Sequence, residues 1–469
     1  MPGTTSARRV AALLVTFLAA CGTPPSPPGG VRDAGGGAPG PRGALEAAVR
    51  VFATGETRGH LQPCKCQERQ FGGLPRRAAY LASTVRTGDL VVDLGNAAEG
   101  DASTRALRLA TTLDALRGMH YAAFVPGELE ALVADTLVAE AAARPELPVV
   151  TANLVRDDGS AAFPAWTLHD LADGRRLGVV GLTQPVRPLP PGWRFVAARD
   201  ALERALAELA GRCDAVVVAS SLDPDETRAV CDGLPAVALG LAASDAPASL
   251  PAPGDRDVVA FDGARAPVVE IGGFAVYVRC VDLDASLRAV RTWRAWLGED
   301  VPGLPSAVAL VERHRAAAAA ADPTLVPDLL RARAADGFAG SAACAECHAA
   351  EHATWAESRH ARAMQSLARE RAARAPECVP CHLVDVPAAG VAADDAAGDA
   401  LGVGCEACHG PRARHIASAV QGIVPPGGAP TWSARDVCTG CHHPPEVVRF
   451  DPDEAWRAIA HGRAHGRAR

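Results

Sequence analysis

Four short motifs near the C-terminus combine two cysteines and a histidine at one fixed spacing. They are Cys344-Ala-Glu-Cys347-His348, Cys378-Val-Pro-Cys381-His382, Cys405-Glu-Ala-Cys408-His409 and Cys438-Thr-Gly-Cys441-His442. This CxxCH pattern is typical of c-type haem attachment. Residues i, i+3 and i+4 of a helical turn share a face, so two thiols can add to the haem vinyl groups while the adjacent imidazole ligates the iron. The motifs therefore predict four covalently bound haem c groups.

Two other interpretations of these cysteines fit less well. Structural zinc sites usually pair two separated half-sites and do not place a histidine directly after the second cysteine. A disulfide framework would leave all four motif histidines unexplained. Covalent haem accounts for both residue types.

Six further histidines in this region are candidates for the second axial ligands of the irons. They are His352, His360, His415, His443, His461 and His465. His352 lies one helical turn after His348, where a surface position is expected. His443 directly follows a motif histidine and cannot reach the same iron from the other side, and His465 lies in an arginine-rich tail. Met364 is expected in the core.

Residues around the motifs resemble those of a known family. The matching segments are Ser341-Ala-Ala-Cys344, Trp355-Ala-Glu-Ser-Arg-His360-Ala361, Gly402-Val-Gly-Cys405 through Pro411, Phe450 and Ile459-Ala-His461. Here the chain resembles the tetrahaem cytochrome c family whose best-known member takes electrons from hydroxylamine oxidoreductase. The resemblance implies that His360, His415 and His461 are distal iron ligands. It also implies that the haem on Cys378 and Cys381 lacks a strong second protein ligand.

The last third of the chain has little regular apolar periodicity. So small an apolar core for four cofactors predicts that the haems form much of the interior. We therefore expect residues 337–469 to be a mostly helical, haem-packed multihaem cytochrome c domain.

The N-terminus has the pattern of a secretion signal over residues 1–20, with two arginines followed by an apolar run and small residues. The run ends Leu18-Ala-Ala-Cys21, which resembles the lipobox of bacterial lipoproteins and implies lipidation of Cys21. A plain signal peptide cut nearby is the alternative. Residues 21–45, rich in Pro and Gly, are predicted to be a tether. We expect an extracytoplasmic, membrane-anchored lipoprotein on the periplasmic or outer-membrane side, in an oxidising compartment.

Composition restricts the remaining chemistry. The chain has 469 residues, of which 48% are hydrophobic, and a formal net charge of −7. This balance suits folded domains and gives no basis for nucleic-acid binding. Lys65 is the only lysine, which excludes a phosphate-loop or pyridoxal lysine elsewhere. After the signal, no apolar run is long enough to predict a transmembrane helix.

Residues 46–284 alternate short β-branched runs with amphipathic stretches, which predicts an α/β domain. Strands are expected at 51–54, 90–94, 122–125, 147–153, 177–182, 215–219 and 236–239, and a pair of strands at 267–284. Helices are expected at 75–86, 104–118, 129–143 and 200–211. Residues 285–336 are predicted to be a helical connector, with helices at 287–297 and 307–321.

This domain is similar to the metallophosphoesterase domain of the 5′-nucleotidase family. The similarity lies in Thr54-Gly-Glu-Thr-Arg-Gly-His60 and in residues 72–77, 91–96, 148–154, 180–183 and 268–273. That family holds two metal ions with Asp, His and Asn ligands.

The ligand positions of that family are altered in this chain. Its Asp-x-His stands as Glu56-Thr57-Arg58, its Gly-Asp as Gly95-Asn96, and its Gly-Asn-His-Glu as Gly127-Glu128-Leu129-Glu130. A later histidine falls at Ser221, and Gly-His-x-His falls at Gly240-Leu-Ala-Ala243. Arginine, leucine and alanine cannot replace imidazole ligands, so no phosphoesterase activity is expected.

Five cysteines are left after haem attachment and lipidation: Cys64, Cys66, Cys213, Cys231 and Cys280. Cys213 and Cys231 each precede a predicted strand, which makes a disulfide between them plausible. Cys64 and Cys66, with His60 nearby, allow a metal site, a vicinal redox pair or pairing with other cysteines. The sequence leaves these alternatives open.

The expected function is electron transfer between redox partner proteins, with the inactive phosphoesterase-like domain as a docking scaffold, rather than enzymatic catalysis. No nucleic-acid partner is expected, and the membrane contact is the lipid anchor. One alternative is an oxidoreductase that acts on a small nitrogen or sulfur compound at an open haem. Another is a phosphatase that uses Glu56, Asp93, Asn96 and Glu128 as an unusual metal set.

Overall fold

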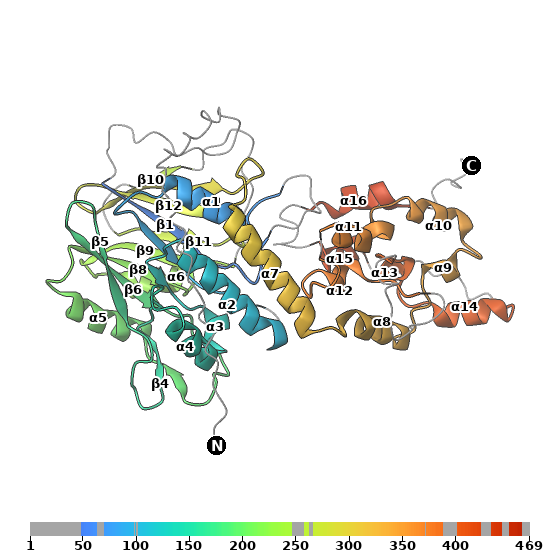
Figure 1. Cartoon of the computed structure of the whole chain (residues 1–469), viewed down its shortest axis with the longest axis horizontal. Helices are drawn as coiled ribbons and strands as arrows, with labels where there is room; N and C mark the ends of the chain where they lie inside the picture. Colours follow the sequence, from blue (N-terminus) through green and yellow to red (C-terminus); the bar gives the residue numbers. More distant parts are fainter. Residues whose placement is uncertain are drawn as a thin grey trace, which may run out of the picture. The chain divides into compact units, whose positions relative to one another are not determined.

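The computed structural model describes residues 48–62, 70–97, 99, 102–245, 258–261, 266–370, 372–387, 401–423, 433–442 and 450–461. Figure 1 shows an α/β part, coloured blue to yellow, and a helical part, coloured orange to red. Cys21, Cys64, Cys66, His443 and His465 lie outside the described residues, as do the signal peptide and the tether.

The first sheet of the α/β part has six strands in the order β10-β13-β12-β1-β2-β3. Parallel pairing joins β1 (Val49–Thr54) to β2 (Leu90–Asp93), and β2 to β3 (Ala123–Phe124). Antiparallel pairing joins β1 to β12 (Tyr277–Leu283), β12 to β13 (Ala289–Trp296), and β13 to the edge strand β10 (Val259–Ala260).

The second sheet has five strands in the order β11-β9-β8-β6-β5. These are β11 (Val268–Ile271), β9 (Val237–Ala243), β8 (Ala215–Ser220), β6 (Arg176–Leu182) and β5 (Trp166–Asp170). A separate ribbon pairs β4 (Leu154–Arg156) with β7 (Trp193–Phe195). One buried cluster contains Val51 and Val92 of the first sheet with Val217 and Leu239 of the second. The two sheets therefore pack face to face.

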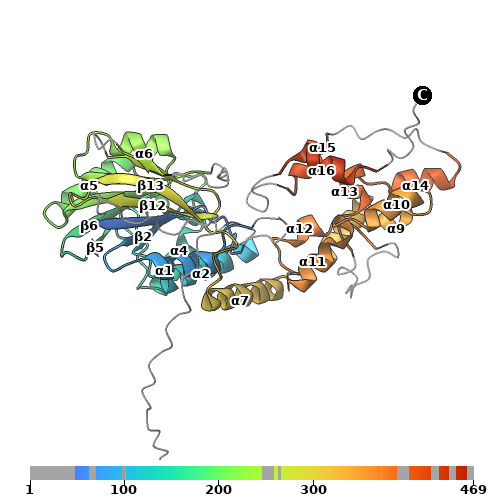
Figure 2. The same ribbon diagram turned by 90° about the horizontal axis from the view of Figure 1, so that it is seen from above.

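Helices cover the outer face of each sheet, as Figure 2 shows. On the first sheet lie α1 (Leu74–Thr84), α2 (Ala102–Gly118), α3 (Glu128–Ala131) and α4 (Ala134–Ala142). On the second lie α5 (Ala198–Leu209) and α6 (Pro224–Cys231). The long helix α7 (Pro305–Ala321) packs along α1 and α2, where His314 Nδ1 is 2.9 Å from Thr111 Oγ1.

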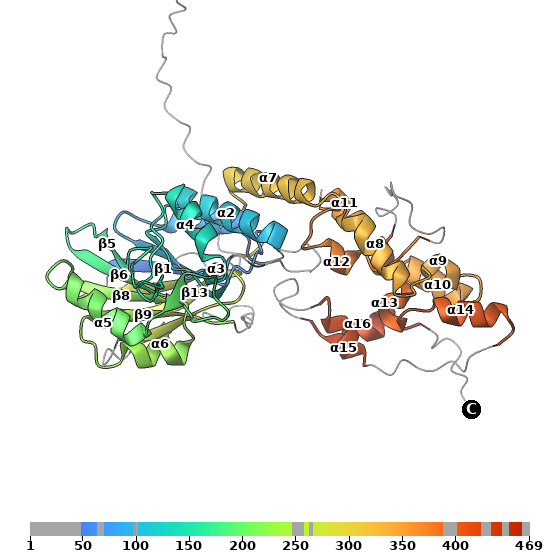
Figure 3. The same cartoon turned by 90° about the horizontal axis from the view of Figure 1, so that it is seen from below.

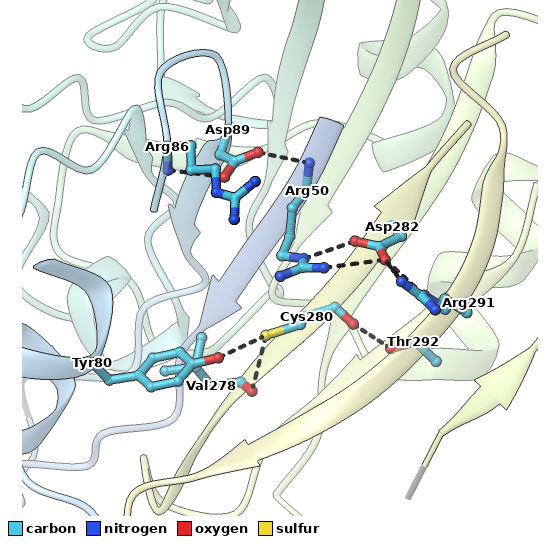
Figure 4. A network of polar contacts seen from close by, with 9 residues as sticks. All are labelled: Arg50, Tyr80, Arg86, Asp89, Val278, Cys280, Asp282, Arg291 and Thr292. Carbon is cyan, nitrogen blue, oxygen red and sulfur yellow. Dashed lines mark hydrogen bonds and ion pairs between the residues drawn. The ribbon is translucent and has the colours of Figure 1, made fainter. Parts of the chain in front are cut away.

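A buried charge network ties β1 to β12 and β13 (Figure 4). The Asp282 carboxylate accepts hydrogen bonds from Arg50 Nε at 2.7 Å and from Arg291 Nε at 2.7 Å. Asp282 and Arg50 are both buried, so the ion pair neutralises charges that would be costly to bury alone. The network thereby fixes the pairing of these three strands.

Most predicted elements are present, and four expectations about the α/β part are wrong. Residues 287–297 are not a helix, because β13 finds a full-length antiparallel partner in β12. The expected helix over 129–143 is divided between α3 and α4. Residues 147–153 make only an isolated bridge, from Val149 to Phe124. Cys213 and Cys231 pack in one apolar cluster but are free thiols, so the disulfide is not formed.

The strands expected within 267–284 exist but do not pair with each other. Strand β11 joins the second sheet, whereas β12 joins the first. Strand β11 hydrogen-bonds β9 along all four of its residues, whereas β12 has a partner on each side, β1 and β13. The connection between them therefore crosses from one sheet to the other.

The helical part contains short helices around a small apolar cluster (Figure 3). They are α8 (Leu325–Ala335), α9 (Ser341–Cys344), α10 (Ala349–Ala356), η1 (His360–Arg362), α11 (Ala363–Arg369), α12 (Val379–His382), α13 (Cys405–His409), α14 (Ala413–Val420), α15 (Ala434–Thr439) and α16 (Pro452–Ile459). Met364 is fully buried in the cluster with Leu330 and Leu383, which is the core position expected for it. Across the described residues, no helix is long and apolar enough to cross a membrane.

Candidate haem-binding site

Each CxxCH motif bends into about one helical turn. His348 N donates to Cys344 O at 2.9 Å, His382 N to Cys378 O at 3.2 Å, and His442 N to Cys438 O at 2.8 Å. In the third motif, α13 runs from Cys405 to His409. The turn places the cysteines and the histidine of a motif on one side, as the spacing predicts.

Three motif histidines each lie opposite a histidine from another segment. The ring centres are 6.5 Å apart for His348 and His415, 6.1 Å for His442 and His360, and 5.8 Å for His409 and His461. Metal–imidazole bonds are about 2 Å long, so two imidazoles on opposite sides of one metal have ring centres about 6 Å apart. The three spacings match this arrangement.

The histidines that lie opposite these motif histidines are the three that the family resemblance named as expected distal ligands. His415 lies six residues after the third motif, yet it faces the first motif. His360 follows the first motif and faces the fourth. His352, by contrast, packs on Trp355 with ring centres 5.2 Å apart. In the tertiary structure, a histidine near one motif therefore lies opposite the histidine of another motif.

The imidazoles at the site are suited to ligate metal. Burial lowers the pKa of His360 and of His409, which favours the neutral ring that binds iron. His382 Nδ1 is 3.1 Å from the carbonyl oxygen of Ala363, a contact that orients the ring. The residues present therefore fit c-type haem.

The motifs are packed against one another in pairs. The Cys344 thiol hydrogen-bonds the Cys405 thiol, and this contact lowers the pKa of Cys405 to about 7. The Cys381 thiol likewise contacts Cys441 and lowers its pKa to about 7. First and third motifs are thus neighbours, as are second and fourth.

A buried carboxylate holds the first and third motifs together. Glu406, inside the third motif, accepts hydrogen bonds from the backbone N–H groups of Ala339, Gly340 and Arg412 at 2.7–3.0 Å. Its side chain is buried. Sequence reasoning did not identify this role, because only the fold brings residues 339–340 beside the motif.

In the loops that match the metal-ligand positions of the phosphoesterase family, the side chains hydrogen-bond to one another. Glu56 accepts hydrogen bonds from Asn96 Nδ2 at 2.6 Å and from Arg58 Nε at 2.8 Å. A second carboxylate, Glu128, is 3.6 Å from Arg58 Nη2. Glu56, Arg58 and Asn96 have φ of 52°, 44° and 55°, which is the sparsely populated left-handed region. Burial raises the pKa of Glu56 to about 7.

Asp93 and Ser221, at two further positions of these loops, also make contacts within the protein. Asp93 is buried between Thr54 Oγ1, 2.5 Å away, and Arg77 Nη1, 3.3 Å away. Ser221 Oγ donates to the carbonyl oxygen of Pro126 at 2.9 Å. Among the described residues, no group of three or more His, Cys, Asp or Glu side chains is placed to hold a metal ion.

Comparison with known proteins agrees with the motif geometry. Residues 343–410 match the family of cytochrome c554 and c-prime. The chain is also similar to cytochrome c-554 of Nitrosomonas europaea, with 36% identity over 90 residues. These residues span 16% of this chain and 38% of that protein. Residues 343–410 are therefore similar to a family of multihaem c-type cytochromes.

Solved structures similar to this chain include three phosphoesterase-fold proteins. The 5′-nucleotidase precursor of Thermus thermophilus has a TM-score of 0.49 and 19% identity, and covers 58% of this chain and 59% of its own. Sulfate thiohydrolase SoxB of Thermus thermophilus has a TM-score of 0.47 and 14% identity, and the match covers 58% of this chain and 60% of SoxB. Calcineurin-like phosphoesterase YfkN of Bacillus subtilis has a TM-score of 0.45 and 12% identity, and the match covers 57% of this chain and 96% of the YfkN chain.

Proposed function

We propose that this chain is an extracytoplasmic, lipid-anchored cytochrome that binds four haem c groups and transfers electrons between redox partner proteins. The observation that carries the proposal is the set of three histidine pairs at 5.8–6.5 Å, each joining a CxxCH motif to a distant segment. A haem between two imidazoles supplies a one-electron iron couple with both axial positions filled. Such a centre favours electron exchange over substrate binding.

The chain's own residues would each perform a distinct task at these centres. Cys344, Cys347 and the cysteines of the other motifs would bind haem covalently. His348, His409 and His442 would ligate from one side, and His415, His461 and His360 from the other. His382 would ligate the iron of the second motif through Nε2, because Nδ1 contacts the Ala363 carbonyl.

We propose that the α/β part is a catalytically inactive scaffold that docks a redox partner. The contacts that support inactivity are those of Glu56 with Asn96 and Arg58, because a guanidinium group occupies the loop that would present an imidazole to a metal. The docking role is inferred from a two-sheet fold whose described residues do not form a metal-ligand set.

Haem counting tests the cofactor proposal directly. Mass spectrometry of the denatured mature protein should show four covalent haem additions per chain. Fewer than four additions would contradict the proposal of four haems, and zinc in place of iron would overturn the cytochrome assignment.

Fractionation tests the anchor. The wild-type protein should partition with membranes, and Cys21→Ser should release it in soluble form with the same haem content. A soluble wild-type protein would contradict lipid anchoring while leaving the haem assignment intact.

A further inference from the structure

The first three motifs meet at one carboxyl group that has no role in the function proposed above. Asp385 lies three residues after the second motif, Ser341 lies three residues before the first cysteine of the first motif, and Cys405 begins the third. Ser341 N donates to Asp385 Oδ1 at 2.8 Å. Cys405 N in turn donates to Ser341 Oγ at 2.9 Å. Asp385 is thereby linked to three of the four haem-binding segments.

The carboxyl group of Asp385 is tightly enclosed. Its residue is only 5% exposed. A Cβ placed on Gly404 would lie 2.7 Å from Asp385 Oδ1 and 2.6 Å from Ser341 Oγ, so only glycine allows this approach. The group therefore sits against the backbone that leads directly into the third motif.

The surroundings of Asp385 favour its neutral form. Burial raises its pKa, and the charge of Glu406 acts in the same direction. Hydrogen bonds from the Ser341 and Val386 backbones oppose this rise. The pKa of a buried carboxyl group changes when a charge is added nearby, because electrostatic interactions are strong in a poorly solvated interior.

The other titratable groups that face Asp385 belong to the same junction. Glu406 is 3% exposed and is held by three backbone N–H donors. Cys344 and Cys405 are thiols in the free chain, but haem attachment converts them to thioethers that do not titrate. Among the described residues, Asp385 and Glu406 are thus the acidic side chains of this junction.

We propose that Asp385 is a proton-binding site coupled to the oxidation state of the haems on the first and third motifs. The inference rests on the proposed function, since it requires haem on these motifs. When an electron from the donor protein enters one of these haems, the Asp385 carboxylate would bind one proton from water. When the electron passes to the acceptor protein, the proton returns to water, so charge and protons balance.

The coupling has a measurable consequence. Reduction raises the pKa of Asp385 further, so between its pKa values in the oxidised and reduced protein the midpoint potential falls as pH rises. For one proton per electron the slope approaches about 59 mV per pH unit, the value of a tenfold change for a one-electron couple.

Potentiometric titration of the full chain at a series of pH values tests the proposal. The wild type should show a pH-dependent midpoint for at least one haem, Asp385→Asn should flatten it, and Asp385→Glu should retain it. Glu357→Gln removes an exposed carboxyl of the helical part that lies outside every motif, and it should leave the slope unchanged. An unchanged slope in Asp385→Asn at full haem loading would overturn the proposal.

A second measurement does not depend on any variant. Reduction of the wild-type protein in unbuffered solution should remove protons from the medium, as an indicator dye reports, and absence of uptake would refute the coupling. Haem content is measured on the same samples. Missing haem in the wild type would refute the proposed function, whereas full loading without proton uptake would refute the inference about Asp385 alone.

Discussion

Replacing His415 with alanine tests the axial-ligand assignment most directly. The His415 ring centre is 6.5 Å from that of His348, the separation expected for two ligands of one iron. Alanine ends at Cβ and supplies no ligating atom. One iron per chain should therefore lose its second imidazole, change from low-spin to high-spin, and bind one additional carbon monoxide molecule after reduction.

The assay combines electron paramagnetic resonance with a carbon monoxide titration per chain. His352→Ala is the matched control, because His352 is a histidine of the same region whose ring packs on Trp355 instead of a motif histidine. It should leave both readouts at wild-type values. His360→Ala and His461→Ala should each convert one haem, as His415→Ala does. Haem loading is checked by mass in every variant.

Two results would refute this reasoning. The first is a fully loaded His415→Ala protein that keeps every low-spin haem of the wild type. The second is a His352→Ala protein that gains a high-spin haem, which would make His352 a ligand and the 6.5 Å pairing incidental. Either result would also remove the main support for the electron-transfer proposal.

The α/β part yields three further predictions. Asp282→Ala should lower the free energy of unfolding by about 3–5 kcal/mol in denaturant titration, because it leaves the buried Arg50 guanidinium without its partner; a loss under 1 kcal/mol would show that water compensates the charge. Nucleotides incubated with added manganese or zinc should release no phosphate, and steady release abolished by Glu56→Ala would contradict the inactive scaffold. Folding raises the pKa of Glu56 from 4.5 to about 7, so the folded state favours its protonated form. Stability should therefore fall as pH rises from about 4.5 to 7, and Glu56→Gln should remove that dependence while the wild type retains it.

The amino-acid sequence alone determined the local chemistry of this protein. Haem attachment depends on five consecutive residues, so Cys344 through His348 and the three equivalent motifs are readable without a fold. The difference from the metal-ligand residue types of the similar family is equally visible at Glu56 and Arg58, because it depends on residue type at a matched position. Alternating apolar runs likewise predicted most strands of both sheets.

Pairings between distant segments were decided only by the tertiary structure. The sequence offered His360, His415 and His461 through a resemblance, but the folded chain set which motif each one faces. It also made β13 a strand, because pairing with β12 outweighs an apolar spacing that suits a helix. Asp385 had no signal in the sequence, since its significance comes from burial and from the backbone N–H of Ser341, 44 residues away. Such contacts depend on how chain segments pack, which local spacing does not encode.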